Sequence, residues 1–245
     1  MRGRVDGLLV MAPDVSAAAL AGALPDGLPT VFLNAPPIKG ATAAVTVDNI
    51  GGTRALVRHI AQLGHQRVAF LCGPPRNADA AARLRGFRVA MRAVHLQVSE
   101  TFVMRGDFTE EGGWRAAREL LAARGAQPTA IVAANDAMAI GALLALREAR
   151  VEVPAEMSVI GFDDIPIARY VTPTLTTVRV AIDELGARAA ALLFRALADR
   201  SALRAPHREV VPAELVIRQS CRHPPPRPRP RSVSSVSSVP VLGSQ

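Results

Sequence analysis

Short runs of apolar residues alternate along this chain with longer segments in which apolar residues recur every three or four positions. The short runs predict buried strands, and the longer segments predict amphipathic helices. The predicted strands occupy residues 7–11, 30–34, 67–72, 101–105, 129–134 and 158–162. The predicted helices occupy residues 50–63, 79–95, 109–124 and 135–149. Strand and helix in repeated succession predict an α/β fold, a doubly wound parallel sheet built through right-handed crossovers.

The pattern is thinner before residue 67. Only residues 7–11 and 30–34 are available there as sheet strands, and two short strands leave edges and faces uncovered. We therefore expect this lobe to be incomplete or to be covered by something else. A last helix is predicted over residues 182–199, after the run TPTLTTVRV and before the run EVVPAELVIRQS, and the second of these runs predicts two more strands.

Composition supports a globular protein with no nucleic-acid surface of its own. With 245 residues, 49% of them apolar, the chain can bury a large core. Four arginines of an acid-free C-terminal stretch supply half of the formal charge of +8, and the other charges are too scattered to bind phosphates. Residues 223–245, rich in Pro, Arg and Ser, are expected to be disordered. This tail is read as inert or frame-shifted rather than as a site for acidic partners.

Cysteine usage and the N-terminus predict a cytoplasmic protein that does not enter a membrane. Two cysteines suit a reducing compartment, and Cys72 lies in a strand pattern as a small buried residue. The run MRGRVDGLLVMAPD is broken by Pro13 and Asp14, so it resembles neither a signal peptide nor a membrane span.

Polar residues gather where the predicted strands end. In open α/β sheets, ligands bind beyond the carboxyl ends of the strands. The residues at or after those ends are Asn34, Asp107, Phe108, Asn135, Asp136, Asp163 and Asp164, and Arg83 lies near the start of the helix after residues 67–72. Asp and Asn can bind vicinal hydroxyls, Arg can donate two parallel hydrogen bonds, and Phe can cover an apolar ring face. This combination predicts a sugar as the ligand.

Each of these residues also has a structural interpretation. For Asp136 and Asp107 we favour a helix cap, with Glu110 completing the second cap. For Asp163, Arg83 and Asn135 we favour contact with the ligand over a cap or a packing role. Asp164 fits equally well in a turn ahead of Pro166.

No motif of the sequence supports catalysis, a cofactor or a metal. The five histidines, at positions 59, 65, 95, 207 and 223, lack metal-ligand spacing. The patterns G-x-G-x-x-G, G-x-x-x-x-G-K-[ST] and G-x-S-x-G do not occur. An enzyme is therefore the least supported class.

Four linked segments resemble the effector-binding domain of the LacI/GalR transcription regulators. They are VDNIGGTRALVRHIAQLGHQRVAFLCGP, RLRGF, GDFTEEGGWRAARELL and PTAIVAANDAMAIGALLALREARVEVPAEMSVIGFDDIPIARYVTPTLTTVRV. The resemblance runs from about Val5 to Arg218 without large gaps. ANDAMAIGAL would also fit periplasmic sugar-binding proteins, whereas IGFDD followed by PTLTTVR is more typical of the regulators.

The resemblance implies two doubly wound parallel-sheet lobes of the periplasmic-binding-protein type, joined by three crossovers, with a small-molecule effector between them. It places residues 1–46 and 181–207 in an incomplete N-terminal lobe, residues 47–180 and 208–221 in a C-terminal lobe, and residues 222–245 in the tail. It implies a homodimer for the complete regulator.

The resemblance also assigns effector contacts residue by residue. Arg83, Phe108, Asn135 and Asp163 match contact positions of the family's C-terminal lobe. Asn34 matches a contact in the N-terminal lobe that is often an Asp. Met11 and Val180 fall at pocket-lining positions where some sugar-binding members carry polar side chains.

Members of this family begin with a helix-turn-helix head and two further strand-helix units, which are not seen ahead of Val5 here. DNA contact is therefore expected only through a missing N-terminal head. The alternatives are a periplasmic-type sugar carrier of the transport class and a gene remnant without function.

Overall fold

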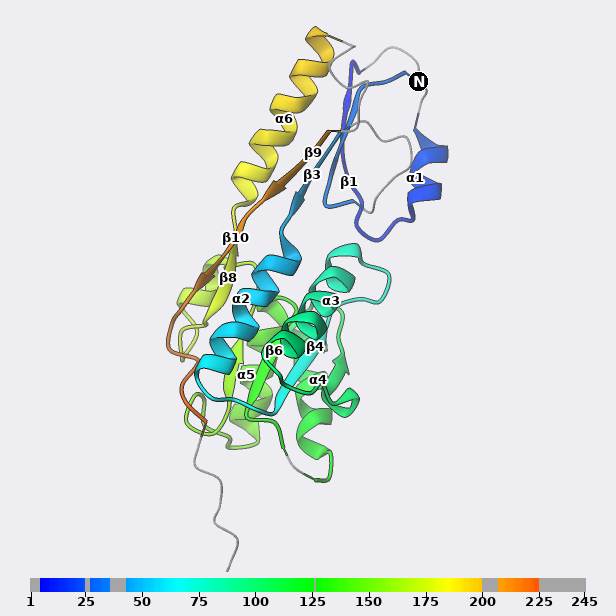
Figure 1. Ribbon diagram of the computed structural model, residues 1–245. Coiled ribbons are helices and arrows are strands. Elements are labelled where there is room, and N and C mark those ends of the chain that lie inside the picture. Colours follow the sequence, from blue (N-terminus) through cyan, green and yellow to red (C-terminus); the bar gives the residue numbers. More distant parts are fainter. Residues whose placement is uncertain (1–4, 25–26, 36–42, 126, 200–206, 225–245) are drawn as a thin grey trace, which may run out of the picture.

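The strands of the chain form two separate parallel sheets joined by an antiparallel ribbon (Figure 1). A computed structural model describes residues 5–24, 27–35, 43–125, 127–199 and 207–224. The first sheet has the order β1 (Leu8–Met11), β2 (Thr30–Leu33), β3 (Ala43–Val47), β9 (His207–Val211). The second sheet has the order β5 (Val103–Arg105), β4 (Val68–Cys72), β6 (Ala130–Ala133), β7 (Ser158–Ile160). These parallel sheets confirm the predicted α/β fold.

Two helices pack against the first sheet, and we call the sheet and these two helices the N-terminal lobe. Helix α6 (Ile182–Ala198) buries the stripe Leu185, Ala189, Leu192 and Ala196, whose spacing of three and four residues keeps one face on the sheet. The short helix α1 (Ala17–Ala23) begins at the cap Ser16 and contributes Leu20 to a second, smaller apolar cluster with Phe32. The two helices pack on the sheet through separate apolar clusters, while Leu9 and Val210 in its outer strands stay exposed.

The prediction of only two strands on this side of the chain was wrong. Strand β3 (AAVTV) was missed because alanine and threonine hide its alternation, yet its residues alternate between buried and half-buried. Strand β9 comes from the far end of the chain and pairs in parallel with all five residues of β3. Hydrophobic runs alone cannot reveal a strand whose neighbour lies more than 150 residues away in the sequence.

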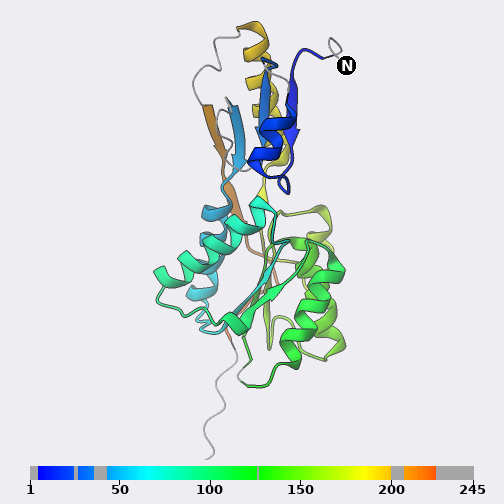
Figure 2. The same cartoon turned by 90° about the vertical axis from the view of Figure 1, so that its right-hand side faces the viewer.

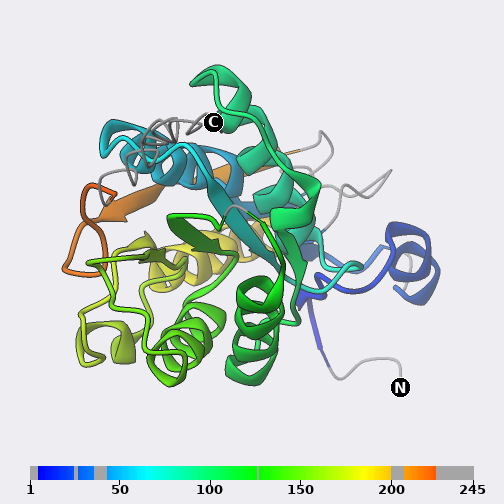
Figure 3. The same cartoon turned by 90° about the horizontal axis from the view of Figure 1, so that it is seen from below.

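The second sheet lies between two pairs of helices, and we call this unit the C-terminal lobe. Helices α2 (Asn49–Gln62) and α3 (Ala78–Ala93) cover one face, and α4 (Glu110–Ala122) and α5 (Asp136–Glu148) cover the other (Figure 3). All four predicted helices are confirmed to within two residues at each end. The predicted strand 101–105 is shorter, because Glu100–Phe102 forms a 3₁₀ turn ahead of β5.

Three segments cross between the lobes, all on one side of the molecule (Figures 1 and 2). They are β3 to α2, β8 (Thr177–Val180) to α6, and β9 to β10 (Ala213–Val216). Strands β8 and β10 pair in antiparallel fashion, so two of the crossings are tied to each other. The two strands predicted in the run EVVPAELVIRQS are β9 and β10, which Pro212 separates, and β8 lies in the run TPTLTTVRV.

The closest helix contact of the C-terminal lobe lies between α4 and α5, and it requires glycine. A Cβ atom on Gly141 would lie 1.9 Å from the carbonyl oxygen of Glu110 and 2.7 Å from the backbone nitrogen of Trp114. Both are backbone atoms, so neither can move without shifting a helix.

We expect Gly141→Ala to lower the free energy of unfolding by about 2–3 kcal/mol, because the added methyl group pushes α4 away from α5. Chemical denaturation measures this change. The control is Gly186→Ala in α6, where a Cβ atom meets nothing within 4 Å and the better helix propensity of alanine leaves stability unchanged or higher. Equal effects of the two substitutions would contradict the close contact.

Candidate functional site

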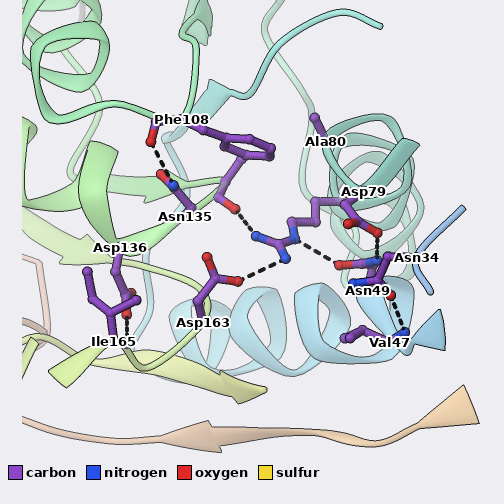
Figure 4. A network of polar contacts seen from close by, with 12 residues as sticks. Asn34, Val47, Asn49, Asp79, Ala80, Phe108, Asn135, Asp136, Asp163 and Ile165 are labelled. Carbon is purple, nitrogen blue, oxygen red and sulfur yellow. Dashed lines mark hydrogen bonds and ion pairs between the residues drawn. The ribbon is translucent and has the colours of Figure 1, made fainter. Parts of the chain in front are cut away.

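Arg83 is the centre of the polar network at the carboxyl ends of the C-terminal strands (Figure 4). Its guanidinium donates from Nε to Oδ1 of Asn49 at 2.8 Å and from Nη1 to the carbonyl oxygen of Ala134 at 2.6 Å. Nη2 forms an ion pair with Oδ1 of Asp163 at 2.9 Å. A guanidinium carries five N–H groups, so these three contacts leave two donors for a ligand.

Aromatic rings lie against the same guanidinium. The ring centre of Phe162 is 3.9 Å from Cζ of Arg83, and that of Phe108 is 5.8 Å away. The ring of Phe108 lies over Gly73, where a Cβ atom would come within 2.3 Å of it. Gly73 therefore leaves the space that Phe108 occupies. The face of Phe162 helps to hold the charge of Arg83 in place.

Asn49 and Asp79 complete the network, and no pattern in the sequence predicted either of them. Asn49, the first residue of α2, donates from Nδ2 to Oδ1 of Asp79 at 2.7 Å while it accepts from Arg83. Burial raises the pKa of Asp79, and the charge of Arg83 and the hydrogen bond from Asn49 act against that rise. A polar pair at two helix starts carries no signal of its own in the sequence, because Asn and Asp are also ordinary caps.

Asp163 follows β7 and is fixed by its backbone as well as by Arg83. Its N–H donates to the carbonyl oxygen of Val178 at 2.8 Å, and its carbonyl oxygen accepts from the N–H of Val180 at 3.3 Å. Burial raises the pKa of its carboxyl group, while the charge and hydrogen bond of Arg83 lower it. The crossing strand β8 therefore sets the position of Asp163.

Asn135 caps α5 and at the same time holds the segment that carries Phe108. Its Oδ1 accepts from the N–H of Met138 at 3.0 Å, and its Nδ2 donates to the carbonyl oxygen of Phe108 at 3.0 Å. One amide hydrogen and one lone pair of Asn135 remain for a ligand. The cap and the predicted ligand contact are thus compatible.

The predicted caps at Asp136 and Asp107 were wrong. Asp136 is fully buried, and its carboxylate accepts from the hydroxyl of Thr177 and from the N–H of Ile165. The cap of α4 is Thr109, whose hydroxyl accepts from Gly112, while Asp107 accepts from the N–H and hydroxyl of Thr109. Asp107 lies two residues before the actual cap Thr109, and Asp136 lies one residue after the actual cap Asn135, so a neighbouring polar residue takes each cap.

Asp164 does more than hold a turn ahead of Pro166. Its buried carboxylate accepts from Arg218 and from Nε of Arg179 at 2.9 Å, and Arg169 lies at 3.6 Å. Burial raises the pKa of this group, but the hydrogen bonds and charges of Arg218 and Arg179 outweigh it, so the pKa lies below the usual value. Asp164 therefore ties both strands of the ribbon, β8 and the end of β10, to the C-terminal lobe.

The three predicted positions at or near the N-terminal lobe differ in their surroundings. Asn34 is buried, and its Oδ1 accepts from the N–H of Val47 at 3.0 Å, at the first crossing. Met11, at the end of β1, is 59% exposed, and Val180 is buried at the end of β8. Arg83 contacts Asp163 and the ring of Phe108, and Asn135 donates to the carbonyl oxygen of Phe108. Asn34 lies apart from these four residues, beside Val47 (Figure 4).

Unusual backbone conformations also gather at the strand ends. Of the six non-glycine residues with positive φ in the part of the chain that the structure describes, four are Asn34, Phe108, Asp163 and Asp164. Such conformations cost free energy and persist where the surroundings determine them, which is typical of binding sites.

The network sets one positive charge, that of Arg83, against two carboxyl groups. Arg83 faces the carboxylates of Asp163 and Asp79, so the site has no excess of positive charge for an anionic ligand. Within the described residues, no group of three or more His, Cys, Asp and Glu side chains could hold a metal ion. No described helix is long and apolar enough to cross a membrane. The arrangement offers directed hydrogen bonds and an aromatic face rather than a nucleophile or an acid-base pair.

Residues 57–221 match the family of periplasmic binding protein-like domains. The ribose operon repressor of Escherichia coli (strain K12) is 35% identical over 188 residues, which are 76% of this chain and 56% of that repressor. A regulatory protein of the LacI family from Chloroflexus aggregans superposes with a TM-score of 0.80 at 32% identity, covering 89% of this chain and 78% of that one. The transcriptional regulator CelR in complex with cellobiose gives a TM-score of 0.81 at 32% identity, covering 89% and 66%.

Fold, network and similarity together define a two-lobed domain of the periplasmic-binding-protein type. More narrowly, the chain belongs to the LacI family, a family of transcription regulators and not of enzymes. It spans about 56% of the length of the curated repressor that it matches.

Asp136 predicts a dependence of stability on pH. Burial raises its pKa to about 7, although the hydrogen bonds from Thr177 and Ile165 act against this rise. Between about pH 4, the unfolded value, and pH 7 the folded chain binds a proton that the unfolded chain has lost. The stability contributed by this group is therefore fully present below about pH 4 and is lost as the pH rises to about 7.

We expect Asp136→Asn to remove this loss. The free energy of unfolding of the wild type should then fall between pH 5 and pH 8 by about 2–4 kcal/mol more than that of the variant. Chemical denaturation at several pH values measures both slopes. The exposed substitution Glu111→Gln should leave the wild-type slope unchanged. Parallel slopes for wild type and Asp136→Asn would show that Asp136 does not titrate in this range.

Proposed function

We propose that this chain is the effector-sensing part of a LacI-family transcription regulator, and that it binds a neutral sugar between its two lobes. The observation that carries the proposal is the guanidinium of Arg83, which is buried, fixed by three protein contacts and left with two donors at the carboxyl ends of the strands. Such a group can donate two hydrogen bonds to ligand hydroxyls without having to be ordered first.

The chemistry of the site supports a sugar over other ligands. Asp163 and Asn135 offer acceptors beside the donors of Arg83, Phe108 offers an apolar face, and the opposed charges favour a neutral molecule. Relatives named for ribose and solved with cellobiose support the same class. We include Asn34, Met11 and Val180 in the proposed site as contacts from the N-terminal lobe and the crossings.

The proposed mechanism is a two-state change in the angle between the lobes. An effector shifts such an equilibrium only by its difference in affinity for the two states. Three crossings on one side of the molecule allow the lobes to rotate about that side. In the proposal residues up to 46 with 181–207 form the N-terminal lobe, and residues 47–180 with 208–221 form the C-terminal lobe. Of the predicted disordered tail, residues 222–245, the part 225–245 lies outside the described residues, whereas Arg222 and His223 are held by hydrogen bonds to Ser158 and Leu63. Because β9 pairs throughout with β3, the boundary at the third crossing, from β9 to β10, is better drawn after Val211 than after residue 207.

We propose that DNA contact belongs to a segment of these regulators that the matched residues do not include, and that the protein acts in the cytoplasm. The repressor that matches here is longer than the matched part, which leaves room for such a segment. A change of lobe angle would alter DNA affinity through the pairing of two chains.

The dimer is proposed to use the outer face of α5. A hollow of about 800 Å³ there is lined mainly by apolar residues, among them Leu144, Val151 and Val171. Leu144 is 40% exposed and the nearby Tyr170 is 78% exposed. Arg147, Arg150 and Glu152 line the same hollow, so this face carries both signs of charge as well as apolar residues.

The first experiment on the ligand is thermal unfolding of the chain with ribose, cellobiose, other pentoses and hexoses, and a purine base. A sugar that binds only the folded chain raises the midpoint. We expect Asp163→Asn to lose the shift given by that sugar, because Arg83 loses its ionic partner and the ligand loses an acceptor, whereas Glu111→Gln keeps it. No shift with any sugar, or an equal shift in both variants, would contradict the proposal.

The dimer face is tested by Leu144→Glu together with Tyr170→Glu. We expect this variant to be monomeric at concentrations where the wild type is a dimer, because two buried charges would face their own copies. Light scattering after size exclusion measures the mass. The control is Val89→Glu on α3, which is 54% exposed and lies on the other face of the sheet. If the double variant still forms a dimer, the dimer does not use this face.

A further inference from the structure

The two lobes are also joined by contacts on the side opposite to the crossings. The segment after β1 in the N-terminal lobe reaches the start of α3 in the C-terminal lobe (Figures 1 and 2). Nδ2 of Asn77 donates to Oδ1 of Asp14 at 2.9 Å, and the N–H of Ala78 donates to the carbonyl oxygen of Pro13 at 3.0 Å. Both bonds join protein atoms of the two lobes directly.

The two polar atoms of the Asn77 side chain have different roles. Its Oδ1 caps α3 by accepting from the N–H groups of Asp79 and Ala80, both at 3.0 Å. Its Nδ2 is then free to reach across to Asp14. Asn77 is buried whereas Asp14 is exposed, so the C-terminal lobe holds its half of the contact rigidly and the other half can leave.

The contact lies close to the network of the proposed site. Asp79, which Asn77 caps, accepts from Asn49, and Asn49 accepts from Arg83. On the other lobe, Asp14 follows the strand that ends at Met11. A change in the angle between the lobes about the crossings would separate Asp14 from Asn77, because these residues lie on the far side from that axis.

We propose that Asp14 and Asn77 are positioning residues of the effector site, which hold the lobes closed over Arg83 by a contact that does not involve the ligand. The proposal rests on the function proposed above, in that the site between the lobes is the effector site. It adds that a contact within the protein, and not only the ligand, stabilises the closed arrangement of the lobes. Loss of the contact favours the open arrangement and so reduces apparent affinity, since only the closed fraction binds.

The test measures the distance between the lobes in the chain without ligand. Spin labels are attached through Ala19→Cys on α1 and Glu119→Cys on α4, both exposed, in a background with Cys72→Ser and Cys221→Ser. We expect Asp14→Ala and Asn77→Asp to shift the distance distribution towards longer values. Asn77→Asp keeps the cap acceptor, so the shift does not come from unfolding of α3, and it replaces the donor by a carboxylate that repels Asp14. Asp6→Ala, an exposed aspartate of the same lobe, should leave the distribution unchanged.

The decisive variant is the exchange Asp14→Asn with Asn77→Asp. It places the donor on the other lobe and restores the hydrogen bond, so the distances should return towards those of the wild type. Distributions that are identical in all variants, or an exchange variant as open as Asn77→Asp, would overturn the proposal.

Ribose binding gives a second measurement, by titration of the same variants. We expect apparent affinity to fall about threefold to tenfold in Asp14→Ala, as the loss of one hydrogen bond to a charged group allows, and to recover in the exchange variant. If ribose binds neither the wild type nor any variant, ribose is not the ligand. The distances between the spin labels then still decide whether the contact holds the lobes together. If ribose binds all variants equally, the proposed positioning role is overturned.

Discussion

The buried charge of Arg83 is the constraint on which the C-terminal lobe and its site depend. A guanidinium out of water is costly unless ion pairs and hydrogen bonds replace its hydration. Here the replacements come from the start of α2, the end of β6 and the loop after β7, so three elements must arrive together before the charge is satisfied. Removal of one partner would leave a buried charge with incomplete contacts, which ties the binding geometry to the stability of the fold.

Residues at the other strand ends also have both a structural role and a place beside the site. Asn135 caps a helix and holds the backbone of Phe108, and Asp164 anchors both strands of the ribbon through arginines. Asp136 lies beneath them as a buried carboxyl group linked to β8 through Thr177. Residues beside the site are thus also the ones that attach the crossing strands, so a ligand that moves Asp163 acts on the segments that join the lobes.

Two different kinds of contact join the lobes. The crossings are covalent and are reinforced by the pairing of β8 with β10, whereas the contact of Asp14 with Asn77 consists of single hydrogen bonds at the opposite side. Hydrogen bonds of this kind are worth little against water, so they can break at small cost. A molecule built in this way can change the angle between its lobes while each sheet stays intact.

The sequence by itself determined the local structure: the helices of the C-terminal lobe, its strands, and the resemblance that marked Arg83, Phe108, Asn135 and Asp163. Hydrophobic periodicity and linked motifs act over short separations, so they can be found in one chain. Only the tertiary structure decided that β9 completes the first sheet, that Asn49 and Asp79 orient Arg83, and that Thr109 and not Asp107 caps α4. These outcomes depend on residues far apart in the chain, or on competition between neighbouring polar groups for one N–H, and neither leaves a periodic signal in the sequence.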